Sequence, residues 1–461
     1  MTICSRIVLA LLVWGALSFG AVYPWGYWPL AAGAIGVGVW AMVVTRAWRE
    51  PRPRAMALAF GGIGAALLVQ MIPLPIGWLR TLSPAADRLL AQLEVGWVQQ
   101  PPDWHSLSID PQGTLTALAL LVACGVLLVG LMRAVSYMPL DWVVGQLTVF
   151  GAVLAVFGIV QRLTAGASDV LLYGFWKPAG LATPFGPFIN RNHFAGWMVM
   201  VLPLAVAAAS ASAQASRGPF RQDWRGWVRW LITPDASRFV FAAVAILIMA
   251  TALVLTGSRS GLASFIGALA VLAWLSSRRE THRSRRVLPA FYSAVLLVAV
   301  IGWAGVSRTA ARFENSAVEL SERAAAWRDT VTIIRDFPIA GTGLGGYGAA
   351  MLVYQTAERQ SIYVQAHNEY LQILAEGGLL VALPALMALL VIVRSIRHRL
   401  RSPETLRSHW LRCGAVAGLV GIAAQSVLEF SLQMPGNAIL CVFLLAVALH
   451  RPASSPDAHR V

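Results

Sequence analysis

Residues 114–132 read TLTALALLVACGVLLVGLM, a mainly apolar run without a charged side chain. A transmembrane helix needs about 20 such residues, because each advances the helix by about 1.5 Å through a hydrocarbon core about 30 Å thick. Comparable runs lie at 7–22, 28–45, 55–74, 141–161, 193–213, 238–256, 259–276, 287–306, 368–393, 411–431 and 436–450. The sequence therefore predicts an all-α polytopic membrane protein of about twelve transmembrane helices, with residues 1–461 forming a single integral membrane domain.

The composition of the chain supports the membrane class. Hydrophobic residues make up 57% of the 461 positions and charged residues only 12%, so a soluble domain would expose extensive apolar surface. The net charge of +15 is spread in short basic clusters between apolar runs, so we expect no nucleic-acid partner. The cysteines have no CxxC spacing and lie in or beside apolar segments, which predicts neither a disulfide framework nor a zinc site.

The basic clusters also predict the orientation of the chain. Segments 46–54, 214–237, 277–286 and 394–412 are strongly basic, and such segments stay in the cytoplasm. The intervening segments then lie outside it, and two of them are long. These are 75–113, rich in proline and tryptophan, and 307–367, which joins the ninth and tenth expected helices and contains a predicted amphipathic helix from Ser321 to Asp336.

Polar residues at the outer ends of the expected helices are candidate site residues, because ionisable groups at membrane depth are costly and usually functional. One group begins the run 193–213 and consists of Asn190, Arg191, Asn192 and His193. Capping would occupy one such side chain, so we expect a function for Arg191. Arg259 lies in TGSRSG, residues 256–261, between two apolar runs. Its small neighbours would let an anion approach the guanidinium, although snorkelling to the interface is an alternative explanation.

Two further groups lie in and after the longest outward segment. Arg323 lies in the predicted amphipathic helix with Arg328, and a salt bridge to Glu319, Glu322 or Asp329 would account for one of these arginines. His367 stands where the segment returns to the membrane, followed by Asn368 and Tyr370. An imidazole there is able to accept a proton from a hydroxyl group or to donate a hydrogen bond.

The glycine-rich run from Gly341 to Gly348 does not predict a nucleotide site, because no strand precedes it and no lysine follows it as in a P-loop. We expect a flexible turn that leads the chain back to the membrane and lets the outer segment close over a site.

Taken in order, these motifs resemble the O-antigen ligase and polysaccharide polymerase family of bacterial membrane glycosyltransferases. The resemblance covers roughly residues 180–390, through Asn190 to Phe194, Gly257 to Gly261, Trp327 to Gly343, His367 to Leu371 and Glu376-Gly377. It implies a GT-C-like fold in the bacterial inner membrane, with both long outward segments and the active site in the periplasm.

The activity implied by the resemblance is a metal-independent, inverting transfer without a cofactor. The donor would be a glycan on undecaprenyl diphosphate within the membrane lipid, and the acceptor a hydroxyl of lipid A core, of another glycan or of a protein. The implied catalytic residues are His367, Arg259 and Arg191, since guanidinium groups stabilise the negative charge that develops on a leaving diphosphate. The implied substrate-binding residues are Arg323, Asn368, Asn190, Asn192, His193 and Tyr370.

Several alternatives remain open at this point. Ligase and polymerase share their donor and leaving group, and a protein O-oligosaccharyltransferase would use the same site. A transporter or flippase of lipid-linked sugars would use the same arginines but would need polar residues near the membrane centre, which runs 28–45, 55–74, 259–276 and 287–306 almost lack. We expect neither glycosidase nor metal-dependent chemistry, because the sequence shows no suitable group of carboxylates.

Overall fold

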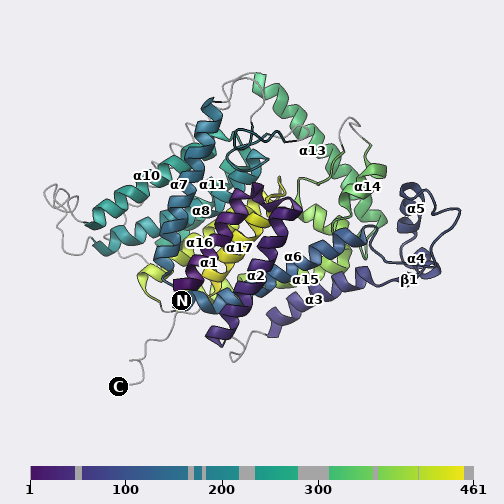
Figure 1. Cartoon of the computed structure of the whole chain (residues 1–461), viewed down its shortest axis with the longest axis horizontal. Coiled ribbons are helices and arrows are strands. Elements are labelled where there is room, and N and C mark those ends of the chain that lie inside the picture. Colours follow the sequence, from purple (N-terminus) through teal and green to yellow (C-terminus); the bar gives the residue numbers. More distant parts are fainter. Residues whose placement is uncertain are drawn as a thin grey trace.

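The computed structural model describes residues 2–46, 54–164, 171–178, 183–216, 234–278, 311–356, 362–402 and 404–450. These residues form an almost wholly helical molecule (Figure 1). The helices are α1 (Thr2–Leu17), α2 (Pro24–Thr45), α3 (Arg54–Met71), α4 (Ile76–Leu82), α5 (Pro84–Leu93), α6 (Pro111–Ala134), α7 (Leu140–Thr164), α8 (Arg191–Ser216), α10 (Pro234–Leu255), α11 (Arg259–Ser277), α13 (Ala311–Asp336), α14 (Tyr347–Tyr354), α15 (Glu369–Arg401), α16 (Leu406–Gln425) and α17 (Pro435–Leu449).

Among the described helices, seven are long and apolar enough to cross a membrane, and they belong to α2, α6, α7, α8, α10, α11 and α15. The apolar helices α1, α3 and α17 are shorter. These elements confirm the predicted all-α polytopic membrane class. The expected run 287–306 lies outside the described residues, so the number of twelve stays a prediction.

Capping side chains set the starts of several helices. Asp110 accepts a hydrogen bond from the N–H of Gly113 at 2.9 Å and begins α6 together with Pro111. Ser258 caps α11 by accepting from the N–H of Gly261 at 3.2 Å. Each cap satisfies a backbone N–H group that has no partner within its own helix. The helix starts are therefore encoded by local sequence.

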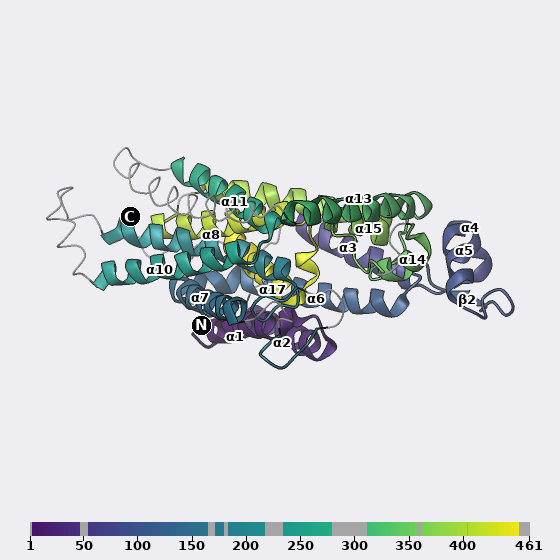
Figure 2. The same ribbon diagram turned by 90° about the horizontal axis from the view of Figure 1, so that it is seen from above.

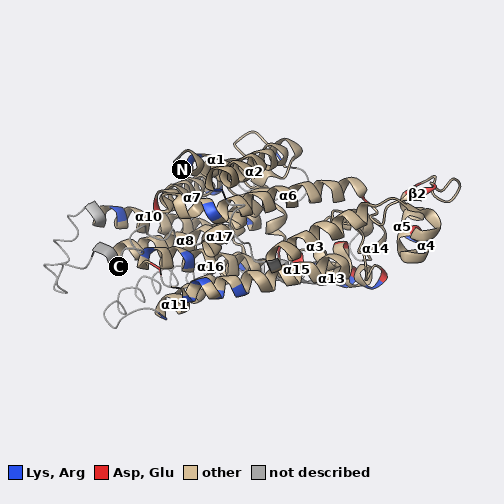
Figure 3. Cartoon of the chain, turned by 90° about the horizontal axis from the view of Figure 1, so that it is seen from below, with Lys and Arg blue, Asp and Glu red and all other residues tan. Residues whose placement is uncertain are grey.

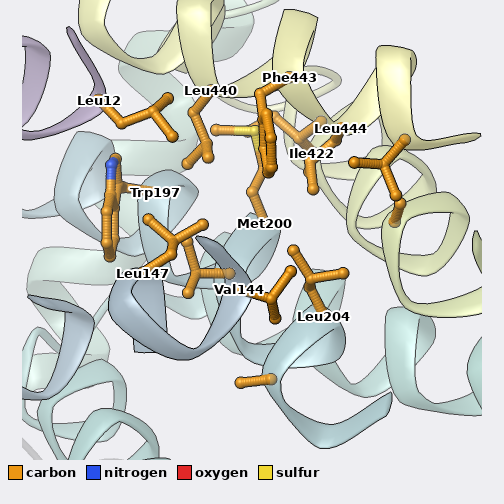
Figure 4. Close-up of a cluster of buried hydrophobic side chains, with 14 of the residues drawn as sticks. Leu12, Val144, Leu147, Trp197, Met200, Leu204, Ile422, Leu440, Phe443 and Leu444 are labelled. Atoms are coloured by element: carbon orange, nitrogen blue, oxygen red, sulfur yellow. The ribbon is translucent and has the colours of Figure 1, made fainter. Parts of the chain in front are cut away.

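Helix α8 occupies the centre of the bundle, where it packs against α7, α10, α11, α16 and α17. Of its most apolar window, 94% is buried, more than in any other described span. Figure 4 shows Trp197, Met200 and Leu204 of α8 among apolar side chains from neighbouring helices. Because a helix buried on all sides has little freedom to shift, the first turn of α8 is a fixed point for the residues around it.

A smaller layer lies at one end of the molecule, where Figure 2 shows α4, α5 and β2 next to α14. Strand β1 (Leu74–Pro75) pairs antiparallel with β2 (Trp104–His105). This layer has an apolar core of its own, which includes Leu79, Leu89, Trp97, Ile333, Phe337 and Tyr347. Segments 75–113 and 307–367 therefore pack on each other. Figure 3 shows basic residues on α10 and α16, toward the opposite end of the molecule.

Helix α13 confirms the helix predicted between Ser321 and Asp336, and it begins earlier, at Ala311. Ala325 and Phe337 are buried, as the apolar pattern predicts, but Val331 and Ile334 are only half-buried. The buried positions between Ala325 and Phe337 are Ala326, Asp329, Thr330 and Ile333. The buried face is thus rotated from the predicted one, because α13 packs against both α14 and α15.

The glycine run forms a close-packed corner. Gly341 and Gly343 have φ values of +66° and +92°, which side chains other than glycine rarely adopt. A Cβ atom at Gly341 would overlap the backbone of Glu376, and one at Gly343 would overlap Ser108. The N–H of Gly343 also donates to the carbonyl of Glu376 at 2.9 Å. This packing differs from the expected flexible turn, because Gly341 is needed for close approach to α15 and Gly343 for close approach to Ser108.

Candidate functional site

The first turn of α8 supplies three of the residues predicted from the sequence. Asn190 precedes the helix, and its Oδ1 accepts a hydrogen bond from the N–H of Asn192 at 2.8 Å. Asn190 therefore has the capping role that was the alternative to substrate binding. The carbonyl of Asn192 accepts from Nε2 of Gln425 at 2.9 Å, which ties this turn to α16.

Glu429 lies at the centre of the site, although it is absent from the residues predicted from the sequence. Its side chain is 1% exposed. One carboxylate oxygen accepts hydrogen bonds from Nδ2 of Asn192 and Nη2 of Arg323, both at 2.7 Å. The other oxygen lies 3.7 Å from Nδ1 of His367, an ion-pair distance longer than a hydrogen bond. Glu429 thus joins residues from three separate segments of the chain.

The charge of Glu429 follows from these neighbours. Burial raises the pKa of its carboxyl group, but His367 and the positive charge of Arg323 outweigh burial, and they hold the pKa below its ordinary value. The carboxylate is therefore ionised at neutral pH. A buried charge of this kind is stable only with partners in place, which Arg323 and Asn192 provide.

The imidazoles of His193 and His367 both contact the ring of Phe430. His193 and His367 both stand edge-on to Phe430, with ring centroids 4.7 and 4.9 Å away. Nε2 of His193 and Nδ1 of His367 are buried and have no hydrogen-bond partner in the described part of the chain. His367 also has a φ of +49°, a left-handed conformation that costs about 1–2 kcal/mol for such a residue. The fold holds this imidazole in place at a cost in backbone strain.

Arg191 lies beside the turn that carries Arg259. A Cβ atom at Gly257 would lie 3.8 Å from Nη1 of Arg191, so the backbone of this turn passes the guanidinium closely. Gly261 packs on α8, where an added Cβ would lie 2.7 Å from Cβ of Ala195. Arg259 is the first residue of α11 and is exposed. The structure therefore places the two predicted motifs next to each other, at the starts of neighbouring helices.

The partner of Arg323 differs from those expected. Its guanidinium pairs with Glu429 and also donates to the carbonyl of Leu428 at 3.0 Å. Asp329 instead accepts hydrogen bonds from Thr356, and the side chains of Glu319 and Glu322 lie outside the described residues. The local salt-bridge rule considers only neighbours on one helix, whereas the carboxylate that Arg323 contacts is 106 positions away in sequence.

Apolar run 411–431 was predicted to be a helix throughout, and this prediction is wrong for its last residues. Helix α16 ends at Gln425, and residues 426–434 form an irregular turn with a short 3₁₀ helix, η4 (Ser431–Gln433). Glu369 holds this turn by accepting from the N–H of Leu432 at 2.7 Å. The turn carries Glu429, a lone carboxylate in an apolar run, which is the signal that would have identified it.

A family model described as O-antigen ligase matches residues 244–386. Over this segment, about a third of its length, the chain is similar to the O-antigen ligase family. The match confirms the family resemblance predicted from the motifs. No curated protein matches the chain by sequence.

The O-antigen ligase segment contains Arg259, Arg323 and His367 but neither Arg191 nor Glu429. Its fold alone therefore does not complete the site, because α8 and the turn after α16 supply the remaining contacts to it. In the described residues, no three His, Cys, Asp or Glu side chains gather where they would hold a metal ion.

Asn368 and Tyr370, also within the O-antigen ligase segment, have partners inside the protein. Oδ1 of Asn368 accepts from the N–H of Leu371 at 3.0 Å and caps α15. The hydroxyl of the exposed Tyr370 donates to the carbonyl of Ala423 at 2.7 Å. Their contacts with a substrate stay a prediction.

Proposed function

We propose that this protein is a membrane glycosyltransferase that moves a glycan from undecaprenyl diphosphate to an acceptor hydroxyl on the periplasmic face of the inner membrane. The O-antigen ligase match and the apolar helices support this class. The observation that carries the proposal is the convergence of Asn192, Arg323 and His367 on the buried Glu429. Ligation to lipid A core and polymerisation of surface polysaccharide both fit this site.

The leaving group determines the role of the arginines. When the bond between the anomeric carbon and the diphosphate breaks, negative charge develops on the phosphate oxygens. We assign Arg191 and Arg259 to that charge, because guanidinium groups form strong paired hydrogen bonds with phosphate. Arg323 is already paired with Glu429 at 2.7 Å. We therefore assign Arg323 to positioning Glu429, which changes the substrate-binding role expected from the sequence.

His367 and Glu429 act on the acceptor. Glu429 lies beside Nδ1 of His367, which favours a proton on that nitrogen and leaves Nε2 as the base. Nε2 takes the proton of the acceptor hydroxyl while its oxygen attacks the anomeric carbon from the side opposite the diphosphate. The glycosidic bond forms, undecaprenyl diphosphate leaves, and the configuration at the carbon inverts. The carboxylate of Glu429 then stabilises the imidazolium ion.

The test is complementation of a strain from which the gene has been deleted. We expect wild type and Arg328→Ala to restore the glycan ladder, and Arg259→Ala and His367→Ala to lose it. Arg328 is a matched control, because it is exposed on α13 and its Nε donates to the carbonyl of Ala324. Full activity of both site variants would refute the proposed roles.

The affected polymer identifies the acceptor. Lipopolysaccharide reduced to a capped core indicates a ligase, surface chains of a single repeat indicate a polymerase, and altered glycoproteins indicate a protein-directed enzyme. Membranes treated with a chelator should retain transfer, and its loss would contradict the metal-independent mechanism. Movement of the lipid-linked glycan across vesicles without formation of a glycosidic bond would instead support a transporter.

A further inference from the structure

A pocket lined by other residues lies apart from the site around Glu429. It is an open pocket of about 270 Å³ between α5, α13 and the end of α14. This volume lies just below the roughly 300–1,000 Å³ usual for pockets that hold drug-sized ligands, so it suits a smaller ligand such as one sugar ring. It belongs to the smaller layer that also contains α4 and β2.

The inner wall of the pocket is held by hydrogen bonds. Asp329 is buried, and its two carboxylate oxygens accept from the N–H and the hydroxyl of Thr356, at 3.0 and 2.7 Å. The hydroxyl of Tyr354 donates to Asp336 at 2.6 Å. These bonds occupy both carboxylates and fix the ring of Tyr354. The pocket therefore has a defined shape without a ligand.

Arg88 supplies hydrogen-bond donors at the edge of the pocket. The guanidinium of Arg88 is exposed and makes no hydrogen bond or ion pair within the described ranges. Gln92 and Thr332 also line the pocket, where Nε2 of Gln92 donates to the carbonyl of Arg88 at 3.5 Å and the hydroxyl of Thr332 to the carbonyl of Arg328 at 3.2 Å. Leu89 and Val353 add apolar surface to the lining. A pyranose ring presents the complementary pattern, because its hydroxyl edge accepts hydrogen bonds and its C–H face packs on apolar and aromatic groups.

The pocket and the site around Glu429 both use residues of α13. Arg323 and Asp329 are six residues apart on α13, which corresponds to a rise of about 9 Å. We propose that this pocket binds a sugar unit of the transferred glycan that is remote from the reacting bond. This inference rests on the transferase function proposed above and adds a subsite that selects for the length and identity of the glycan.

The test uses the purified full-length protein and two undecaprenyl diphosphate donors, one bearing a single sugar and one bearing the complete repeat unit of the host. For Arg88→Ala combined with Gln92→Ala, we expect KM for the longer donor to rise about tenfold with unchanged kcat, as the loss of a charge-assisted hydrogen bond implies. KM for the single-sugar donor should not change. Arg88→Lys should give an intermediate KM, because lysine keeps the charge but not the planar fork.

Arg80→Ala is the matched control. Arg80 is a neighbouring arginine on α4 that pairs with Asp87 at 3.3 Å, and we expect this variant to behave as wild type. Equal KM values for the longer donor in wild type and the double variant would overturn the subsite.

Calorimetry with the free repeat-unit oligosaccharide separates this inference from the proposed function, because it needs no transfer. Binding by wild type that the double variant loses would support the subsite even if no donor is consumed. An absence of binding, together with unchanged KM values, would overturn the subsite while leaving the transferase function intact.

Discussion

Glu429 connects groups that appear in the sequence as separate motifs. It contacts Asn192 from α8, Arg323 from α13 and His367 from the segment before α15. Its side chain is as buried as that of Glu404, which pairs with Arg412 at 3.0 Å near the start of α16. The two carboxylates are therefore comparable in environment, but only Glu429 lies beside a candidate catalytic histidine.

This comparison gives a prediction at the level of the residue. Glu429→Gln keeps an oxygen that accepts from Arg323 but removes the charge that stabilises the imidazolium ion of His367. We expect the transfer rate per folded protein to fall roughly 10²- to 10⁴-fold, the range usual for loss of acid–base assistance. Turnover of a lipid-linked donor by the purified variant measures this effect.

Glu404→Gln is the control, because it makes the same change at an equally buried carboxylate that pairs with an arginine in another part of the fold. We expect it to retain transfer even where its folding is weakened. A similar loss in both variants would mean that Glu429 acts only through stability, and a normal rate in Glu429→Gln would exclude the role assigned to the pair.

At the residue level, the basic residues of the candidate site are easier to predict from the sequence than its carboxylate. Arg191, Arg259 and His367 are recognisable because they interrupt the outer ends of apolar runs. The partner of Arg323 was not predictable from helix neighbours, since Glu429 is distant in sequence and lies within a run assigned to a membrane helix. Asn190 was recognised, but its cap is the simpler role that the structure supports.

At the level of the elements, close contact between α8 and α11 keeps the Arg259 turn beside Arg191. Gly261 permits this contact, because a Cβ atom there would lie 2.7 Å from Cβ of Ala195. Gly267 on the same helix has open space around it. Substitutions at these two glycines therefore distinguish a loss of close packing between helices from the change in helix propensity that occurs when glycine is replaced.

We predict that Gly261→Ala lowers the free energy of unfolding by about 1–3 kcal/mol, the usual result of overpacking, and reduces transfer by moving the Arg259 turn. Gly267→Ala should leave activity unchanged and stabilise the helix by up to about 1 kcal/mol. Thermal unfolding in detergent, combined with donor turnover, measures both effects. Equal behaviour of the two variants would contradict a requirement for close packing at Gly261.

Most elements follow from the sequence, because apolar length and capping residues are local properties. The runs that predict α2, α6, α7 and α10 lie within or largely overlap helices of the structure. The end of α16 and the packed corner at Gly341 were not predicted, since both depend on contacts with α15. The local sequence indicates how long an apolar helix can be, but it does not indicate which distant segments will pack against that helix.

At the level of the whole molecule, the site is assembled from parts inside and outside the family segment. Residues 244–386 supply Arg259, Arg323 and His367, whereas α8 and the turn before α17 complete the environment of Glu429. The central position of α8 explains how these parts are held relative to one another, because Arg191 in its first turn lies beside the Arg259 turn and Asn192 donates to Glu429. The first turn of α8 therefore lies between the Arg259 turn and Glu429, the two groups to which we assign phosphate binding and acceptor activation.

The most direct measurement of this account is a transfer reaction with purified protein in lipid nanodiscs, an undecaprenyl diphosphate-linked glycan of known anomeric configuration and a lipid A core or glycan acceptor. We predict that wild type releases undecaprenyl diphosphate and forms a glycosidic bond of inverted configuration, and that His367→Ala forms almost none. A product of retained configuration, or a His367→Ala variant as fast as wild type, would contradict the account.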